Sequence, residues 1–409
     1  MDVSFELALL IIGALLLAAA ALSGWLRGTV LSISVLSVAA GIALAELGVV
    51  EVTPGAKSVI YVVELALVLT LFADGLVVED ELLRDHWTPA ALALVIAMPL
   101  TLLFLALAAK GLFPALTWYE AFLLGAILSP TDPVVTSAVV TDVRVPATVR
   151  HTLNLESGLN DGLALPFVLF FLALATGAGS AGTEALRLTA ETVAGAGVGI
   201  VLALFGAWLL GRLPRGGVEP KYVGIYALAL AFLAFGISEQ TGWANGLIAV
   251  FVGGIALGVV QHSLPDEYLE FNETLSALFQ VITFTAFGAL IVETGWVGST
   301  PRLALFIAFA LFVARPVAVM LALLPVREPR PHKVFIAWFG PKGVASMLFA
   351  LLVLNSTDAH RTLVFDIASY TIITSILLHG LSDTIGANVL ARWLQTGGQS
   401  APTTRSANP

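Results

Sequence analysis

The chain has 409 residues, of which 58% are hydrophobic and only 11% charged, and its mean hydropathy is +0.96. A soluble domain is about half apolar and about one quarter charged, so this composition excludes a soluble enzyme. A formal net charge of −9 without a dense Lys/Arg patch argues against nucleic-acid binding, and the lack of cysteine excludes disulfides and thiolate metal sites. The sequence therefore predicts an all-α polytopic membrane protein, because stretches of about 20 apolar residues each span one bilayer.

Polar, glycine and proline breaks divide the chain into about 13 transmembrane helices. In chain order the predicted spans cover 5–23, 29–50, 58–77, 89–109, 118–140, 154–175, 191–210, 221–238, 244–260, 274–292, 302–324, 333–354 and 366–390. The first span is not a signal peptide, since it carries Asp2 and Glu6 in place of a basic region and a second span follows at once. Residues 1–393 are thus expected to form one transmembrane domain. Residues 394–409 are expected to form a short polar tail that is too small to fold.

The Lys and Arg residues between the spans predict the orientation. Twelve lie in one set of loops: Arg27, Arg84, Arg144, Arg150, Arg212, Arg215, Lys221, Arg327, Arg330, Lys333, Arg392 and Arg405. Five lie in the other set: Lys57, Lys110, Arg187, Arg302 and Arg361. Because cytoplasmic loops are richer in these residues, the N-terminus is expected outside and the C-terminus in the cytoplasm.

The spans divide into two similar halves. Repeat one covers 5–175, a linking span covers 191–210, and repeat two covers 221–390. Their fifth spans are interrupted at matching places, by SPTDP at 129–133 and by GPKG at 340–343. An odd connecting span inverts the second copy. Inverted repeats with interrupted helices indicate a secondary transporter with its site near the midplane.

Asp132 lies inside span 5, between Pro130 and Pro133. Ionisable side chains inside a span need a partner, water or a function. Each proline lacks an N–H and disrupts the helical hydrogen bonds, which frees carbonyl groups such as that of Thr131 to bind a cation. The alternative interpretation is a kinked helix with a capping Asp.

Span 6 carries a row of oxygen-bearing side chains, NLESGLNDG at 154–162. Glu156 and Asn160 stack four residues apart, and Ser157 and Asp161 stack in the adjacent row. These hard oxygen ligands suit Na⁺, K⁺ or H⁺ rather than soft metals. The alternative is a capping cluster on a structural helix, although the neighbouring glycines leave room for an ion.

Two cations also lie within spans. Arg315 is always charged and needs a fixed anion, for which Glu156 is the candidate. Lys342 lies at the helix break of span 12, where it is expected to stabilise the C-terminal end of a half-helix. For both residues the sequence favours a structural role.

Three further polar residues in the spans are assigned no function. Glu64 and Asp74 on span 3 are expected to face a wet crevice or the bundle interior, and His379 is expected to be a satisfied core histidine. The sequence contains no HExxH, no GxSxG and no phosphate-binding loop. We therefore expect neither an enzyme nor a cofactor.

Four of these segments resemble a known family. LSPTDP at 128–133, followed on the next span by ESGLNDG at 156–162, is similar to the electroneutral branch of the monovalent cation:proton antiporters, the sodium/proton exchangers. ARP at 314–316 and WFGPKG at 338–343 resemble later motifs of that family. The resemblance covers nearly the whole membrane region. One departure is Lys342, where many electroneutral members have Arg.

The resemblance implies a homodimer in the cell membrane, with crossed unwound helices in each protomer, here spans 5 and 12. It implies that Asp161 binds a cation and a proton in turn. Asp132, the Thr131 carbonyl and Ser157 would then complete the alkali cation shell.

The resemblance also implies that Glu156 is bridged to Arg315, and that Asn160 stands where the electrogenic branch has a second Asp. Because a midplane carboxylate can be neutralised by one guest at a time, cation and proton compete for it. The expected function is electroneutral one-for-one exchange of protons for Na⁺, or for K⁺ or Li⁺, which would serve sodium transport and pH homeostasis. The alternatives are an electrogenic antiporter of the same fold, a cation channel, and a sensor that has lost transport.

Overall fold

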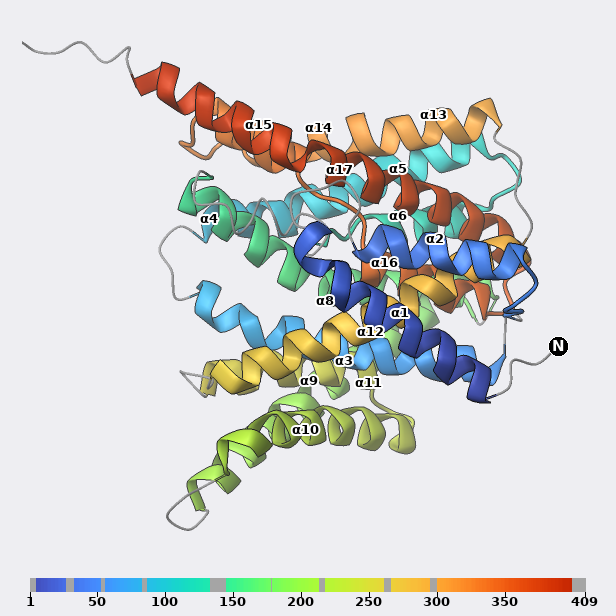
Figure 1. Ribbon diagram of the computed structural model, residues 1–409, viewed down its shortest axis with the longest axis vertical. Helices are drawn as coiled ribbons and strands as arrows, with labels where there is room; N and C mark the ends of the chain where they lie inside the picture. The colour runs from blue at the N-terminus through green and yellow to red at the C-terminus, as the bar shows by residue number, and fades with distance from the viewer. Residues whose placement is uncertain are drawn as a thin grey trace, which may run out of the picture.

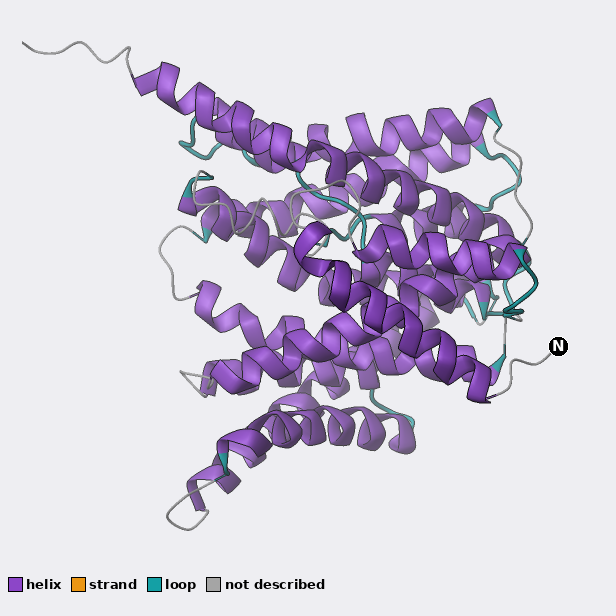
Figure 2. Ribbon diagram, in the orientation of Figure 1, coloured by secondary structure: helices purple, strands orange, loops and turns teal. Residues whose placement is uncertain are grey.

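The structure, a computed structural model, describes residues 5–26, 33–52, 56–82, 87–132, 145–177, 179–212, 218–260, 266–294 and 300–398. Over these residues the chain forms helices, turns and loops without a strand (Figure 2). Seven described helical segments are long and apolar enough to cross a membrane, and shorter apolar helices accompany them. The prediction of an all-helical, multi-pass chain is therefore confirmed.

The helices follow the predicted spans in order. The first half contains α1 (Phe5–Leu26), α2 (Ile33–Glu46), α3 (Lys57–Leu82), α4 (Thr88–Leu92), η1 (Ala93–Ala97), α5 (Met98–Leu112), α6 (Trp118–Leu128) and α8 (Ala147–Ala175). After α9 (Ala181–Arg212), the second half contains α10 (Pro220–Thr241), α11 (Gly246–Val260), α12 (Asp266–Glu293), α13 (Pro301–Phe309), η2 (Ala310–Ala314), α14 (Arg315–Ala322), α15 (Arg330–Trp338), α16 (Val344–Leu354) and α17 (Arg361–Gly398). The part of span 5 from 133 to 140 lies outside the described residues.

The helices lie side by side across the molecule, with α10 at one edge (Figure 1). α11 packs between α3 and α9, and α12 packs along α2. α1 begins and α17 ends on opposite sides of the molecule (Figure 1). At the centre lies α16, whose residues 347–351 are fully buried. A helix that is apolar around its whole circumference can be buried in this way, and the sequence ASMLFALLVL has that composition.

Two short π-helical turns lie at matching places in the two halves and were not predicted. η1 directly precedes Met98-Pro99, and η2 directly precedes Arg315-Pro316. Proline lacks an N–H, so the regular hydrogen bonding of the preceding turn cannot continue through it, and a π-turn accommodates the change.

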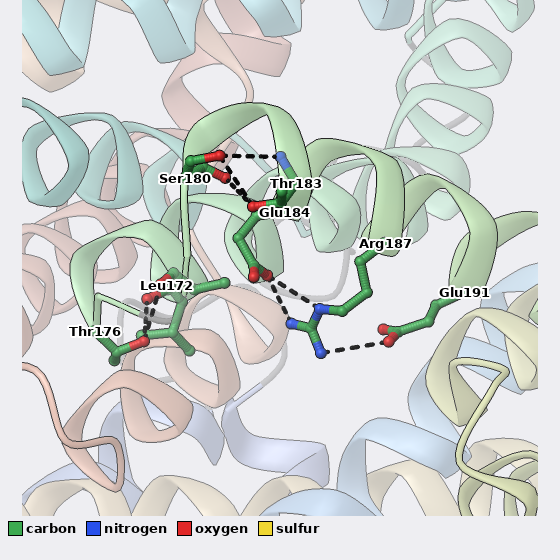
Figure 3. A network of polar contacts seen from close by, with 8 residues as sticks. Leu172, Thr176, Ser180, Thr183, Glu184, Arg187 and Glu191 are labelled. Carbon is green, nitrogen blue, oxygen red and sulfur yellow. Dashed lines mark hydrogen bonds and ion pairs between the residues drawn. The ribbon is translucent and has the colours of Figure 1, made fainter.

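Some helices are longer than predicted, because polar turns continue them beyond the apolar stretch. α9 begins at Ala181, ten residues before the predicted 191. Figure 3 shows the reason: Arg187 bonds Glu184 at 2.8 Å and Glu191 at 3.4 Å, one helical turn away on each side. α17 likewise runs to Gly398, past the boundary at 393, so residues 394–398 of the expected unfolded tail are helical. Residues 399–409 lie outside the described part of the chain.

Candidate functional site

Polar side chains of α8 hold the end of α6. The helix stops at Leu128, and Pro130 follows it without an N–H to continue the ladder. The carbonyl oxygen of Thr131 accepts hydrogen bonds from Ser157 Oγ and from Asn160 Nδ2, the latter at 3.3 Å. Asn160 Nδ2 also donates to Thr131 Oγ1 at 2.7 Å. Three predicted site residues therefore meet where the helix is interrupted.

A second interruption separates α15 from α16 and contacts the first one. Residues 339–343 are not helical. The Asp132 N–H donates to the Pro341 carbonyl oxygen at 2.9 Å. The Val344 N–H, at the start of α16, donates to Asp132 Oδ2 at 3.0 Å. Asp132 therefore bonds the interrupted segment with both its backbone and its carboxylate.

Lys342 makes the reciprocal contact with the end of α6. Its Nζ lies 3.2 Å from the Pro130 carbonyl oxygen and 3.5 Å from that of Ser129. A helix carries partial positive charge at its N-terminus and partial negative charge at its C-terminus. Asp132 at the start of α16 and Lys342 at the end of α6 complement both charges. Lys342 of the second interruption thus lies at the C-terminal end of α6, the half-helix of the first.

Two glycines of the GPKG segment allow these close approaches. A Cβ at Gly343 would collide with the carboxylate of Asp132, and a Cβ at Gly340 would collide with the guanidinium of Arg315. Neither position accepts a side chain unless the charged group moves. The glycines therefore interrupt the helix and also leave the space that the charged side chains of the site occupy.

Arg315 and Glu156 form a bidentate ion pair inside the protein. The Nη1–Oε1 distance is 2.6 Å and the Nη2–Oε2 distance is 3.2 Å. Both residues are buried, with 5% and 3% of their surface exposed. A buried charge with an ideally placed partner is tolerated, whereas a single one is not. The structure thus joins the two residues that the sequence paired and gives Glu156 a fixed cation.

Asp161 lies one helical turn from Ser157 on α8 and is buried. Over the described residues, its Oδ1 has no hydrogen-bond partner. Lys342 and Asp132 both lie close enough to act on its charge. A buried carboxylate oxygen with unused acceptor capacity can take up a proton or a cation.

Asp74 on α3 is a third carboxylate beside this site, and the sequence interpretation missed its role. It interacts electrostatically with both Asp132 and Asp161. Gly158 of α8 lies against its carbonyl group: a Cβ there would be 3.7 Å from the Asp74 oxygen. Glu64 on the same helix interacts instead with Glu239. The available signal was an acid in the middle of an apolar span.

The donor set defines which ions the site suits. Within the described residues, no group of three or more His, Asp and Glu side chains is arranged to hold a metal ion. A cation here would be held by a mixture of carboxylate, hydroxyl and carbonyl oxygens. Such a set suits alkali ions better than transition metals.

Comparison with known proteins gives a consistent result. A family model described as "Sodium/hydrogen exchanger, transmembrane" matches residues 11–385. The K(+)/H(+) antiporter NhaP of Alkalimonas amylolytica is 27% identical over 335 residues, which are 81% of this chain and 57% of that protein. The Na(+)/H(+) antiporter 2 of Zygosaccharomyces rouxii is 25% identical over 383 residues, 84% of this chain and 47% of that protein. The chain thus spans about half the length of these curated relatives.

A solved structure has the same fold. The sodium proton antiporter MjNhaP1 from Methanocaldococcus jannaschii superimposes with a TM-score of 0.75 at 22% sequence identity. The match covers 93% of this chain and 97% of that one. Both chains therefore share one architecture over nearly their whole length.

Proposed function

The chain belongs to the sodium/hydrogen exchanger family, and on this premise we propose that it exchanges protons for monovalent cations across a membrane. The observation that carries the proposal is Asp161, a buried carboxylate beside two interrupted helices, one oxygen of which has no hydrogen-bond partner in the part of the chain that the structure describes. Such a group is costly when bare and is neutralised by either a proton or a cation.

Competition for this carboxylate couples the two fluxes. Asp161 binds the proton and the cation in turn, and Asp132, Ser157 and the Thr131 carbonyl supply the other oxygens of the cation shell. Asp74 is a further candidate ligand, because it acts on the charge of both aspartates. Only the neutralised states cross between the two faces, which prevents a leak of either ion.

The exchange is proposed to be electroneutral, one proton for one cation, with Na⁺ as the first candidate and K⁺ or Li⁺ as alternatives. Asn160 supports this count, because it donates from its amide to Thr131 and adds no titrating acid next to Asp161. Asp74 supports an electrogenic stoichiometry as the second candidate, because it is a further carboxylate beside the site. Exchange in proteoliposomes that generates or follows a membrane voltage would select the electrogenic count.

The proposed architecture has 13 spans in two inverted repeats, with the interrupted helices of spans 5 and 12 crossing at the midplane. It is supported by the contacts between Asp132 and Pro341 and by the matching positions of η1 and η2. The protein is proposed to lie in the cell membrane as a homodimer, with its N-terminus outside and its C-terminus in the cytoplasm.

The test is Asp161→Asn in everted membrane vesicles. This variant removes the charge that both ions neutralise, so cation addition should no longer change the transmembrane pH difference. Glu184→Gln is the matched control, because it neutralises a carboxylate of α9 that pairs with Arg187 outside the site (Figure 3). It should exchange like the unaltered protein. Exchange that persists in the Asp161→Asn protein would refute the assignment.

A further inference from the structure

One face of α17 lies against the interrupted segment between α15 and α16. Ser375 and His379, one helical turn apart, have 0% and 2% of their surface exposed, and Lys342 of the segment has 1%. α17 also packs closely against Phe339, the first residue of the segment, since a Cβ at Gly386 of α17 would be 2.5 Å from the Phe339 ring. The polar side chains of this face therefore meet the segment inside the protein.

These side chains bond the backbone before the break and within it. The Lys342 N–H, inside the non-helical segment, donates to Ser375 Oγ at 2.9 Å. The Trp338 carbonyl oxygen, at the last residue of α15, lies 3.0 Å from His379 Nε2. His379 Nδ1 lies 3.2 Å from Ser375 Oγ and 2.8 Å from the Ser375 carbonyl oxygen. Ser375 and His379 thus connect the last residue of α15 to Lys342 inside the non-helical segment.

The arrangement depends on where the imidazole proton lies. A carbonyl oxygen only accepts, so the bond to Trp338 requires a proton on Nε2, and a bond to the Ser375 carbonyl oxygen requires a proton on Nδ1. In the neutral Nε2–H form, Nδ1 accepts from the Ser375 hydroxyl. In the charged form, Nδ1 donates to the Ser375 carbonyl oxygen. The bond to Trp338 therefore forms in both of these states and is absent from the neutral Nδ1–H form.

The first interruption is held in a similar way. There, Ser157 and Asn160 of α8 bond Thr131, as Ser375 and His379 of α17 bond Lys342 and Trp338. In each case the helix of the next span, α8 or α17, holds the break with a hydroxyl and a nitrogen donor. α8 also carries Asp161 at this level, whereas residues 375–382 of α17 have no acidic side chain.

We propose that His379 and Ser375 are positioning residues for the exchange site. By fixing the segment between Trp338 and Val344, they fix Lys342 against the end of α6 and the Val344 N–H against Asp132. The proposal rests on the exchange function and extends it to two residues outside the ion shell. Loss of this contact lets the segment shift, so cation affinity falls while the carboxylates stay in place.

The test compares His379→Leu with His379→Gln. Leucine removes the Nε2 donor, whereas the amide nitrogen of glutamine can replace it. Since a lost buried hydrogen bond is worth about tenfold in binding, His379→Leu should raise the KM for the alkali cation roughly tenfold with little change in maximal rate. His379→Gln should restore the KM to near the unaltered value. Ser375→Ala, which removes the acceptor of the Lys342 N–H, should raise the KM in the same direction.

The control is Thr371→Val, which removes a buried hydroxyl that bonds the Ile367 carbonyl oxygen within α17. It should leave the KM unchanged. Size-exclusion chromatography in detergent shows which variants fold, and Ser375→Ala decides the question where His379→Leu is not recovered. A folded Leu or Ala variant with an unaltered KM overturns the proposal, as does a Gln variant no better than Leu. An unaltered protein that exchanges nothing refutes the exchange function instead.

Discussion

Glu156 is a buried carboxylate whose fixed counter-ion is the guanidinium of Arg315. Both oxygens of Glu156 bond the guanidinium, whereas Asp161, on the same helix, keeps one oxygen without a hydrogen-bond partner among the described residues. The same side-chain chemistry thus has two uses on one helix, because one acid is permanently neutralised and the other is available to ions.

Glu156→Gln tests the structural use. It leaves Arg315 buried without its partner, and breaking such a pair costs about 3–5 kcal/mol of stability. We expect a clear fall in the thermal unfolding temperature in detergent. In Glu184→Gln the same change affects a pair whose Arg187 side chain is 52% exposed, and such pairs are worth about 1 kcal/mol or less. An equal loss in both variants would show that the buried pair has no special structural weight.

Asp358, in the connection between α16 and α17, is a second acid in an unusual environment. It is buried beside the carboxyl group of Glu120 at the start of α6. His360 Nδ1 lies 2.8 Å from Glu120 Oε1 on the same cluster. Burial, together with the neighbouring Glu120 carboxylate, raises the pKa of Asp358 from 3.8 to about 6.

This shift predicts how stability depends on pH. Between pH 3.8 and about 6, the folded protein keeps a proton at Asp358 that the unfolded chain has released. The free energy of unfolding therefore falls as pH rises through this window and stays lower above it. Asp358→Asn should remove that contribution, so the unfolding temperature of the variant should fall less from pH 4 to pH 7. Identical pH profiles for the two proteins would contradict the prediction.

At the scale of the helix, glycine contacts decide how closely α3, α9 and α11 pack. A Cβ at Gly199 of α9 would collide with the Ala249 carbonyl oxygen of α11, and one at Gly254 of α11 would lie 2.6 Å from the Phe72 oxygen of α3. Small residues let helix backbones approach closely in membranes. These helices therefore pack through their glycine faces.

Gly199→Ala should destabilise the protein, because the added methyl group meets backbone that cannot rotate away. Overpacking of this kind costs about 1–3 kcal/mol. Gly197→Ala is the control on the same helix, since a Cβ there has nothing within 4 Å. Thermal unfolding of the purified proteins compares the two. The packing argument would be wrong if Gly197→Ala lowered the unfolding temperature as much as Gly199→Ala.

The sequence predicted helices well and their interruptions in part. Long apolar stretches located α3, α5 and α10, because an apolar segment that spans a membrane must satisfy its own backbone hydrogen bonds and therefore forms a helix. The breaks of spans 5 and 12 were visible from proline and glycine. η1 and η2 were not predicted, since a π-turn depends on how neighbouring helices accommodate a proline, and prolines also occur in regular helices.

At the scale of the whole molecule, the site joins residues that are far apart in the chain. Asp161, Asp132 and Lys342 could be selected from the sequence, because they are charged and lie beside breaks. Asp74 was visible as an acid in an apolar span, but its electrostatic interaction with Asp132 and Asp161 was not, since that interaction arises only when α3 packs against α8. The contact of His379 with Trp338 depends likewise on how α17 lies along the break.

The orientation of the molecule in the membrane gives the last prediction. The chain has no cysteine, so single-cysteine variants can be labelled without background. Ser180 and Ala359 are exposed in loops that the Lys/Arg distribution places outside, and Arg327 is exposed in a loop that it places in the cytoplasm. An impermeant thiol reagent should label Ser180→Cys and Ala359→Cys in intact cells, and Arg327→Cys only in everted vesicles.

If all three variants were labelled from the opposite faces, the predicted orientation would be wrong, with the N-terminus in the cytoplasm, and the fold would be unaffected. Labelling of Ser180→Cys and Ala359→Cys from opposite faces would have a larger consequence. Six crossings, or three pairs, separate these two loops only if the interrupted α15 and α16 together make one crossing. Labelling from opposite faces would therefore refute the inverted repeat. It would also refute the argument that the two breaks meet at the midplane.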